Sequence, residues 1–418
     1  MRGCPQFSRP WVGWFWLLMW GVFSPPLEGQ QNRVRVGAEV LLQNYISLIS
    51  GKRVGIICNH TSILPNKTRL IDTLLSKGIS VTALFSPEHG IRGNVPAGVN
   101  VGESIEEKTG LPVFSLYQNK TTANILEGVD VLLFDLQDVG ARFFTYYITM
   151  AHAMEIAAAA KKIFIVLDRP NPINGSDIEG PVLDSSLQSP VGRFPLAIRH
   201  GLTLGEMARM IVGEKWIPCD TTFSLIVVPM EGWKRTMYYD ETGLPWIAPS
   251  PNMKFLSTAL VYPGTCLIEG TNLSEGRGSY RPFEYVGAPW LDGNRLAKTL
   301  DSMQIPGARF HAIKFTPKSD SIRAPNPKYN GESCSGIFLQ VTDRRSFHPV
   351  ITAVKMISAI RSLFSFRFEF LPRLFDRLAG SASLRSVLEK SAALDSLLTS
   401  GAYELDSYRI LRARYLLY

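Results

Sequence analysis

Short, continuous apolar runs alternate with amphipathic segments along the first half of the chain, and this alternation constrains the fold more than any other feature. The pattern predicts strands at 53–58, 81–85, 112–116, 131–134 and 163–167, with helices at 38–49, 69–77 and 144–160. Strands that are apolar throughout are buried on both faces, as in a mostly parallel sheet covered by helices. We therefore expect an α/β, Rossmann-like domain, with the order of its strands left open.

The chain has 418 residues, which is enough for two domains. A predicted helix at 203–214 and a strand at 223–228 lead into a stretch at 231–251 that is rich in Trp, Pro and Gly. We place a domain boundary there, which gives a Rossmann-like catalytic domain at 30–244 and a smaller domain at 245–418. The second domain mixes short strands at 308–315 and 335–341 with helices at 349–362 and 383–391, so it is predicted to be α+β.

The amino terminus has the pattern of a secretory signal. Arg2 and Arg9 precede an apolar run at 11–23, which is too short to span a bilayer comfortably. We expect a signal peptide at 1–29 and a secreted or periplasmic protein that meets the membrane only through this segment; an uncleaved anchor is the alternative. The four later cysteines form no C-x-x-C pair, so neither a zinc finger nor a thioredoxin-type site is expected, and any disulfide pairing stays open.

Several functions that a Rossmann-like sheet suggests lack their motifs here. The first strand runs into Asn59 and His60 instead of a glycine-rich phosphate loop, and the chain has neither a Walker A motif nor a G-x-S-x-G elbow. The formal net charge is +8, yet no dense Lys/Arg cluster with interleaved aromatic residues occurs. We therefore expect no nucleotide cofactor, or any other cofactor, and no nucleic-acid partner.

Polar residues follow four of the predicted strands at the point where each strand ends. They are Asn59 and His60, then Glu88 and His89, then Asp135, Asp138 and Arg142, and finally Asp168, Arg169 and Asn171. The carboxyl ends of parallel strands share one edge of a sheet, where ligands bind in open α/β folds. Any one of these residues could be a helix cap or a loop hydrogen bond, but so many ionisable groups at one edge favour a functional site.

A stretch of the second half, 268–284, has the same character. It contains three glycines, the carboxylates Glu269, Glu275 and Glu284, and the guanidinium groups of Arg277 and Arg281. It is too polar for a core, and functional residues concentrate on such loops, so we interpret it as a binding loop.

Paired carboxyl groups are the machinery of glycoside hydrolysis, and Arg and amide groups beside them suit a sugar with an acidic substituent. A metal site built from His60, His89, Asp135 and Asp138 is an alternative, although none of these residues has the i, i+4 spacing of a helical metal motif.

Four motifs in order resemble one known family, the NamZ exo-β-N-acetylmuramidases. They are Ser-Pro-Glu-His-Gly at 86–90, Phe-Asp-Leu-Gln-Asp-Val-Gly-Ala-Arg-Phe at 134–143, Asp-Arg-Pro-Asn-Pro at 168–172 and Glu-Gly-Thr-Asn-Leu-Ser-Glu-Gly-Arg-Gly at 269–278. The resemblance covers nearly all of the chain after residue 54. It implies a Rossmann-like domain joined to a smaller one, with the active site between them. It also implies release of N-acetylmuramic acid from the non-reducing ends of peptidoglycan fragments, so that muramyl saccharides are the expected partners.

The resemblance favours Glu88 as the catalytic residue, and we assign it the role of general acid/base, with His89 orienting it or contacting the sugar. The second catalytic group stays open among Asp135, Asp138, Glu269 and Glu275, or it is the substrate's own acetamido group. Arg142 and Arg277 are the candidates for binding the lactyl carboxylate, because a guanidinium binds a carboxylate bidentately. The other residues expected to bind substrate are Asn59, Asp168, Arg169, Asn171, Asn272 and Glu275.

Two functions of other kinds remain as alternatives. One is a cell-wall module that binds glycan ends without cutting them, and the other is a metal-dependent hydrolase of another bond.

Overall fold

The computed structural model describes residues 33–96, 102–117, 123–390 and 394–418, together with Met1, Gly3 and Gln6. The predicted signal segment at 1–29 lies outside the described residues, apart from those three. The chain divides into two compact units, Met1–Asn32 and Arg33–Tyr418, and every described helix and strand belongs to the second. Within the part of the chain that is described, no helix is both long enough and apolar enough to cross a membrane.

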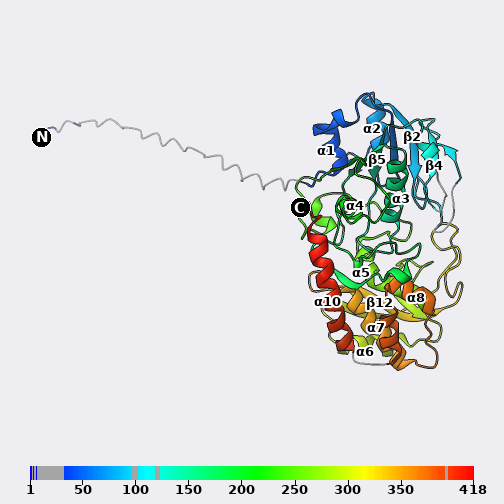
Figure 1. Ribbon diagram of the computed structural model, residues 1–418. Coiled ribbons are helices and arrows are strands. Elements are labelled where there is room, and N and C mark those ends of the chain that lie inside the picture. The colour runs from blue at the N-terminus through cyan, green and yellow to red at the C-terminus, as the bar shows by residue number, and fades with distance from the viewer. Residues whose placement is uncertain (2, 4–5, 7–32, 97–101, 118–122, 391–393) are drawn as a thin grey trace. The chain divides into compact units, whose positions relative to one another are not determined.

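A seven-stranded sheet forms the first half of the second unit (Figure 1). Its strands are β1 (Val54–Cys58), β2 (Val81–Ser86), β3 (Ser104–Ile105), β4 (Pro112–Ser115), β5 (Val131–Asp135), β6 (Ile163–Leu167) and β9 (Leu225–Val228). The order is β3-β4-β2-β1-β5-β6-β9, and all neighbours are parallel except the short edge strand β3, which runs antiparallel to β4. The predicted mostly parallel, Rossmann-like sheet is therefore confirmed.

Helices cover both faces of this sheet. Helices α1 (Gly37–Asn44) and α2 (Leu70–Ser76) pack on one face, while α3 (Tyr146–Ala159) and α4 (Leu204–Gly213) pack on the other. Side chains alternate along each strand, so Leu133 of β5 belongs to the α1–α2 core and Phe134 to the α3–α4 core. The same alternation decides on which side of the sheet a polar residue lies when it ends a strand.

One of these helices ends earlier than the sequence predicts, and another begins at a recognisable cap. The helix predicted at 38–49 stops at Asn44 and continues as a separate 3-10 turn, Ile46–Leu48. Helix α4 begins at a capping box, in which the Thr203 hydroxyl accepts from the Glu206 amide and the Glu206 carboxylate accepts from the Thr203 amide.

The second half has a three-stranded antiparallel sheet with helices around it, as the α+β prediction requires. The strands are β10 (Tyr285–Ala288), β11 (Ala308–Phe315) and β12 (Cys334–Val341), in the order β10-β12-β11. The helices are α5 (Leu256–Thr265), α6 (Gly293–Ser302), α7 (Pro349–Leu363), α8 (Pro372–Ala379), α9 (Ala382–Lys390) and α10 (Leu394–Ala413). A hairpin of β7 (Glu179–Val182) and β8 (Ala197–Arg199) lies in the first half, between β6 and α4 in sequence.

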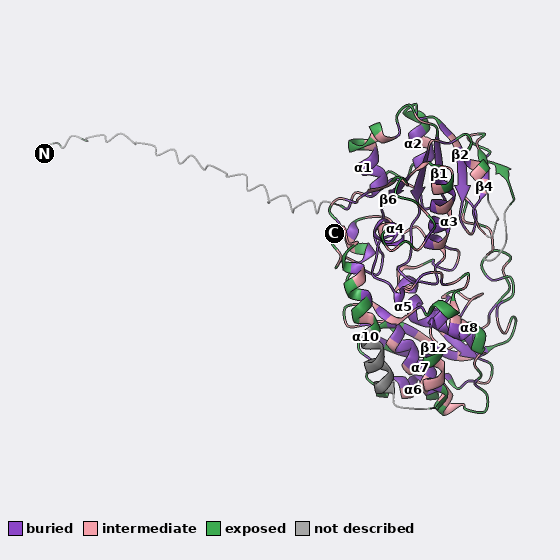
Figure 2. Cartoon of the chain, in the orientation of Figure 1, coloured by how far each residue is buried: buried purple, intermediate pink, exposed green. Residues whose placement is uncertain are grey.

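The carboxy-terminal segment returns to the first half, as Figure 1 shows for α10. Arg412 of α10 donates to the carbonyl oxygens of Gly175 and Gly201, and the Tyr418 hydroxyl donates to Asp168 at the end of β6. Buried residues run through both halves of this unit (Figure 2). The boundary near residue 245 stays a prediction.

Candidate active site

A cavity of about 140 Å³ opens where the two halves meet, and residues from both line it. From the first half come Glu88, His89, Tyr117, Phe143, Phe144, Thr145, Pro190 and Val191. From the second come Ser250, Asn252, Met253, Tyr262, Cys266, Glu269, Arg277, Phe283 and Leu378. Four of the residues expected from the sequence therefore share one cavity: Glu88, His89, Glu269 and Arg277.

Glu88 is held by a hydroxyl at the start of α3. It lies two residues beyond β2 and is half-buried. The Thr145 Oγ1 donates a hydrogen bond of 2.7 Å to Glu88 Oε2. Thr145 is the N-cap residue of α3, yet its side chain does not cap the helix. Threonine is a common N-cap residue because its oxygen accepts a hydrogen bond from a free amide of the first turn. Here the hydroxyl donates to the Glu88 carboxylate instead.

The loop after Glu88 turns sharply through backbone conformations that most residues avoid. His89 has a φ of 72°, as does Gly90, and a histidine at positive φ marks a local constraint. The His89 Nδ1 lies 2.7 Å from the Val95 carbonyl oxygen, which requires the proton on Nδ1. Further along, a Cβ on Gly93 would come within 2.1 Å of the His60 ring, so the loop needs glycine there.

Glu269 and Arg277 form an ion pair in the cavity wall. Arg277 donates to Glu269 Oε1 from Nη2 at 2.8 Å and from Nε at 3.1 Å, and Glu275 Oε1 lies 3.6 Å from Nε. Burial works to lower the pKa of Arg277, but the two carboxylates outweigh it and raise that pKa. Burial raises the pKa of Glu275, and repulsion from Glu269 adds to the rise.

A lysine keeps the turn that carries Glu269 in place. The Lys328 Nζ donates to four backbone carbonyls of one segment, those of Ile268, Glu269, Thr271 and Leu273, at 2.7–3.2 Å. It also lies 3.5 Å from Glu275 Oε2. One ammonium group therefore satisfies the carbonyls at the end of the 3-10 helix Cys266–Gly270 and compensates part of the acidic charge of the loop.

Aromatic rings form one wall of the cavity. Tyr262 of α5 meets Phe283 edge-on with ring centroids 4.7 Å apart, and it meets Phe143 in the same way at 5.0 Å. Phe144 extends this cluster, at 6.5 Å from Tyr262. Interlocked edge-to-face rings are rigid and present an apolar surface. The sequence does not reveal this wall, because its members lie in segments that come together only in the fold.

The buried Arg142 lies outside the cavity lining, and among the described residues it forms no ion pair with a carboxylate. Its guanidinium donates to the carbonyl oxygens of Pro181, Leu196 and Leu378 at 2.7–2.8 Å. Burial lowers its pKa to about 10. Gly380 packs directly over the group, since a Cβ there would lie 2.4 Å from Arg142 Nη2. Arg142 therefore ties the β7–β8 hairpin to α8.

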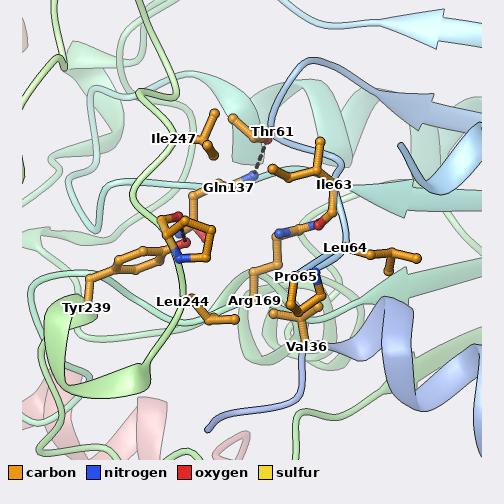
Figure 3. Close-up of a pocket in the computed structure, with 11 residues that line it drawn as sticks. Val36, Thr61, Ile63, Leu64, Pro65, Gln137, Arg169, Tyr239, Leu244 and Ile247 are labelled. Carbon is orange, nitrogen blue, oxygen red and sulfur yellow. Dashed lines mark hydrogen bonds between the residues drawn. The ribbon is translucent and has the colours of Figure 1, made fainter. Parts of the chain in front are cut away.

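Asp135 and Arg169 form a buried ion pair on the other face of the sheet. Arg169 Nε and Nη2 donate to the two carboxylate oxygens of Asp135 at 2.5 and 3.0 Å. Alternation places Asp135 on the α1–α2 side, as it does Leu133. Arg169 lines a separate pocket, shown in Figure 3, with Val36, Thr61, Gln137 and Tyr239 among its neighbours. Its walls carry no free carboxylate, so it does not share the chemistry of the cavity around Glu88.

Asp168 holds α4 and the end of the chain. Its carboxylate accepts from the Thr203 and Tyr418 hydroxyls, both at 2.7 Å, and from the Gly205 amide at 2.8 Å. Burial raises the pKa of Asp168 to about 6, although these donors oppose the rise. Asp168 thus lies outside the cavity lining.

The side-chain amides of Asn59, Asn171 and Asn272 also serve the fold. The Nδ2 groups of Asn171 and Asn272 donate to the carbonyls of Leu202 and Arg367. Asn59 Nδ2 donates to the Tyr146 hydroxyl at 2.9 Å, and Asn59 Oδ1 accepts from Thr61. None of the three lines the cavity.

Asp138 is a buried residue of the loop after β5. Its Oδ1 accepts from the Gly140 amide at 2.7 Å and lies 3.7 Å from His200 Nε2. Burial raises the pKa of Tyr146, and the charges of Glu88 and Asp138 add to that rise. Asp138 does not line the cavity.

The described part of the chain shows neither a cluster of metal-ligating side chains nor a disulfide. The described residues include no group of three or more His, Cys, Asp or Glu side chains placed to hold a metal ion. The His60 Nε2 lies 2.7 Å from the Ala248 carbonyl, and burial lowers its pKa. Cys58, Cys219, Cys266 and Cys334 are all unpaired.

A parallel α/β sheet whose strand-end carboxylate opens into an aromatic-walled cavity, with a carboxylate–arginine pair in the same wall, is typical of an enzyme that acts on a sugar. Comparisons with known proteins identify the enzyme family. Residues 54–257 match the N-terminal region, and 260–418 the C-terminal region, of the family described as exo-β-N-acetylmuramidase NamZ. The chain belongs to this family and is a glycoside hydrolase.

Individual relatives support the same family assignment. The chain is 42% identical over 414 residues to the peptidoglycan β-N-acetylmuramidase NamZ of Bacillus subtilis, covering 96% of this chain and 97% of that protein. Crystal structures of two DUF1343 family proteins from Bacteroides fragilis are each 34% identical to it. They superpose with TM-scores of 0.83 and 0.77, and each match covers 92% of this chain and 99% of the other.

Proposed function

We propose that the protein is an exo-acting β-N-acetylmuramidase that releases N-acetylmuramic acid from the non-reducing ends of peptidoglycan fragments, with Glu88 as general acid/base. The observation that carries the assignment of Glu88 is its place in the cavity, held by Thr145. The substrate class is supported by the relationship to the Bacillus subtilis enzyme, which is 42% identical over nearly the whole chain.

In this mechanism the Glu88 carboxyl group donates a proton to the glycosidic oxygen as the bond to the leaving sugar breaks. It then takes a proton from the water that completes hydrolysis. The Thr145 hydroxyl binds Oε2 and so limits rotation of the carboxyl group. A fixed carboxyl group meets the leaving oxygen in a reactive geometry more often than a freely rotating one.

Glu269 is the preferred second carboxylate, because it shares the cavity with Glu88 while Asp135, Asp138 and Glu275 lie outside its lining. It forms an ion pair with Arg277, and a carboxylate in the cavity suits stabilisation of a positively charged transition state. Participation by the substrate's acetamido group remains the alternative for this role. Arg277 is the proposed partner of the lactyl carboxylate, and the aromatic wall would take the apolar face of the sugar ring.

A secreted or periplasmic location is part of the proposal. Peptidoglycan lies outside the cytoplasmic membrane, and the basic and apolar pattern of residues 1–29 supports export.

The test compares Glu88→Gln with the wild type on two β-N-acetylmuramides. One carries N-acetylglucosamine as the leaving group, and the other carries an activated aryl group that needs little protonation. We expect the variant to lose at least about a hundredfold in kcat on the sugar substrate, and clearly less on the aryl substrate, because general acid catalysis contributes about 10²–10⁴-fold. Glu127→Gln, at an exposed position outside the cavity lining, is the matched control.

Mass spectrometry identifies the released sugar. Equal losses on both substrates would contradict the general-acid role, and unchanged turnover would remove Glu88 from catalysis. Binding of muropeptides by the wild type without any product would favour a binding module, while loss of activity on chelation would favour a metal-dependent hydrolase.

A further inference from the structure

A cluster of aromatic and basic side chains that the mechanism does not use follows directly, in sequence, on two segments that line the cavity. This rim cluster consists of Lys254, Phe255, Tyr280 and Arg281. Lys254 directly follows Asn252 and Met253, which line the cavity. Tyr280 and Arg281 lie on the loop between Arg277 and Phe283, which line it as well. Two cavity-lining segments therefore lead into the cluster.

The rim cluster exposes a large aromatic side chain to solvent. Tyr280 is 62% exposed, although its ring lies against Phe255 with centroids 5.5 Å apart. Exposed aromatic groups beside a cavity are typical of binding surfaces, because tyrosine offers a rigid contact area at little cost in conformational entropy.

The two rings hold two cations in place. Lys254 Nζ lies 4.7 Å from the centroid of Tyr280 and 5.2 Å from that of Phe255, while the Arg281 guanidinium lies 4.3 Å from the centroid of Phe255. Cation–π contacts of this kind restrain long side chains that would otherwise move freely. The charges at the rim are therefore partly ordered before any ligand arrives.

The two cations differ in whether a carboxylate neutralises their charge. Arg281 pairs with Glu284, whose Oε2 lies 3.1 Å from Nη1. Lys254 is exposed and, among the residues that the structure describes, forms no ion pair within 4.0 Å. Arg323, whose carbonyl accepts from Asn252, is likewise exposed and unpaired in the described part of the chain. The rim thus has positive charge available to a ligand.

We propose that the rim cluster is a subsite for the leaving part of the substrate, and that Lys254 binds a carboxylate of that leaving part. This inference rests on the proposed function. An exo-acting enzyme holds the terminal sugar in its cavity, so the rest of the glycan must pass the mouth. That remainder carries a lactyl carboxylate or a peptide carboxylate on its next muramic acid. The Tyr280 ring offers the accompanying apolar contact.

The test measures binding of the leaving fragment directly, by calorimetric titration of the full chain with disaccharides. One ligand is N-acetylglucosaminyl-N-acetylmuramic acid, a second is the same disaccharide with its lactyl group amidated to a short acidic peptide, and the neutral reference is N,N′-diacetylchitobiose. We expect at least one acidic ligand to bind about fivefold more tightly than the reference, as an exposed ion pair allows. We also expect Lys254→Met to abolish this preference and high salt to weaken it. Lys298→Met, at an exposed position on α6, is the matched control.

Comparing the affinity of the disaccharide that has a free lactyl group with that of the peptide-bearing disaccharide shows which of the two carboxylates Lys254 binds. Equal affinities for all three ligands, or a preference that Lys254→Met leaves intact, would overturn the inference. Turnover of a trisaccharide is measured in parallel and reports on the proposed function: a wild type that binds the acidic disaccharide through Lys254 but releases no N-acetylmuramic acid would refute the activity alone.

Discussion

Replacing Thr145 with valine would remove one hydroxyl and leave a side chain of nearly the same shape. In the structure that hydroxyl donates to Glu88 Oε2 at 2.7 Å and makes no capping bond to α3. The substitution therefore removes a hydrogen bond to a carboxylate without a cost to the helix. Hydrogen bonds to charged groups are worth about 1.5–3 kcal/mol. If this energy serves to orient Glu88, it corresponds to about a ten- to hundredfold loss in rate.

The assay is steady-state hydrolysis of a β-N-acetylmuramide by Thr145→Val and Thr145→Ser. We expect the valine variant to lose that factor in kcat with KM little changed, because Thr145 positions the acid and is not proposed to bind the sugar. Serine keeps the hydroxyl and should restore most of the rate. A valine variant with the wild-type kcat would refute the reasoning, and so would a serine variant as impaired as the valine one. Urea midpoints of both variants exclude a general loss of stability as the cause.

Two further predictions concern buried groups. Burial raises the pKa of Glu179, on β7, from 4.5 to about 7. At about 1.4 kcal/mol per pH unit, this means that about 3 kcal/mol of stability, present below pH 4.5, is lost as the pH rises to 7. Glu179→Gln should therefore gain on the wild type over that range in urea unfolding, and parallel stability curves would contradict the shift. Arg142→Leu leaves three buried carbonyls without their donor, at a cost of about 3 kcal/mol or more. The loss should appear in the urea midpoint; a stable variant with a raised KM would instead assign Arg142 to the substrate.

The polar residues at the strand ends show how far sequence reasoning reaches. Their common place at the carboxyl edge follows from parallel strands, and the structure has those strands. Alternation also separates them: Asp135 projects to the α1–α2 side with Leu133, whereas Asp168 reaches Thr203 and Gly205 at the start of α4. Sequence alone did not reveal which side of that edge would open into a cavity.

The arginines make the same point. Arg142 and Arg277 both occur in motifs that resemble the family, and the sequence offered no reason to separate them. The structure gives Arg142 three carbonyl partners in the interior and gives Arg277 a carboxylate partner in the cavity wall. A guanidinium serves either purpose, and only its neighbours decide which.

The sequence by itself determined the class of the fold, because continuous apolar runs and amphipathic helices are local patterns that burial in a covered sheet requires. It also identified the family, through four motifs in the right order. The tertiary structure alone decided which of those residues share a cavity. Thr145 reaches Glu88 from 57 residues away, and Glu269 and Arg277 come from the other half of the chain. Contacts at such separation depend on how whole elements pack, and no local pattern records that.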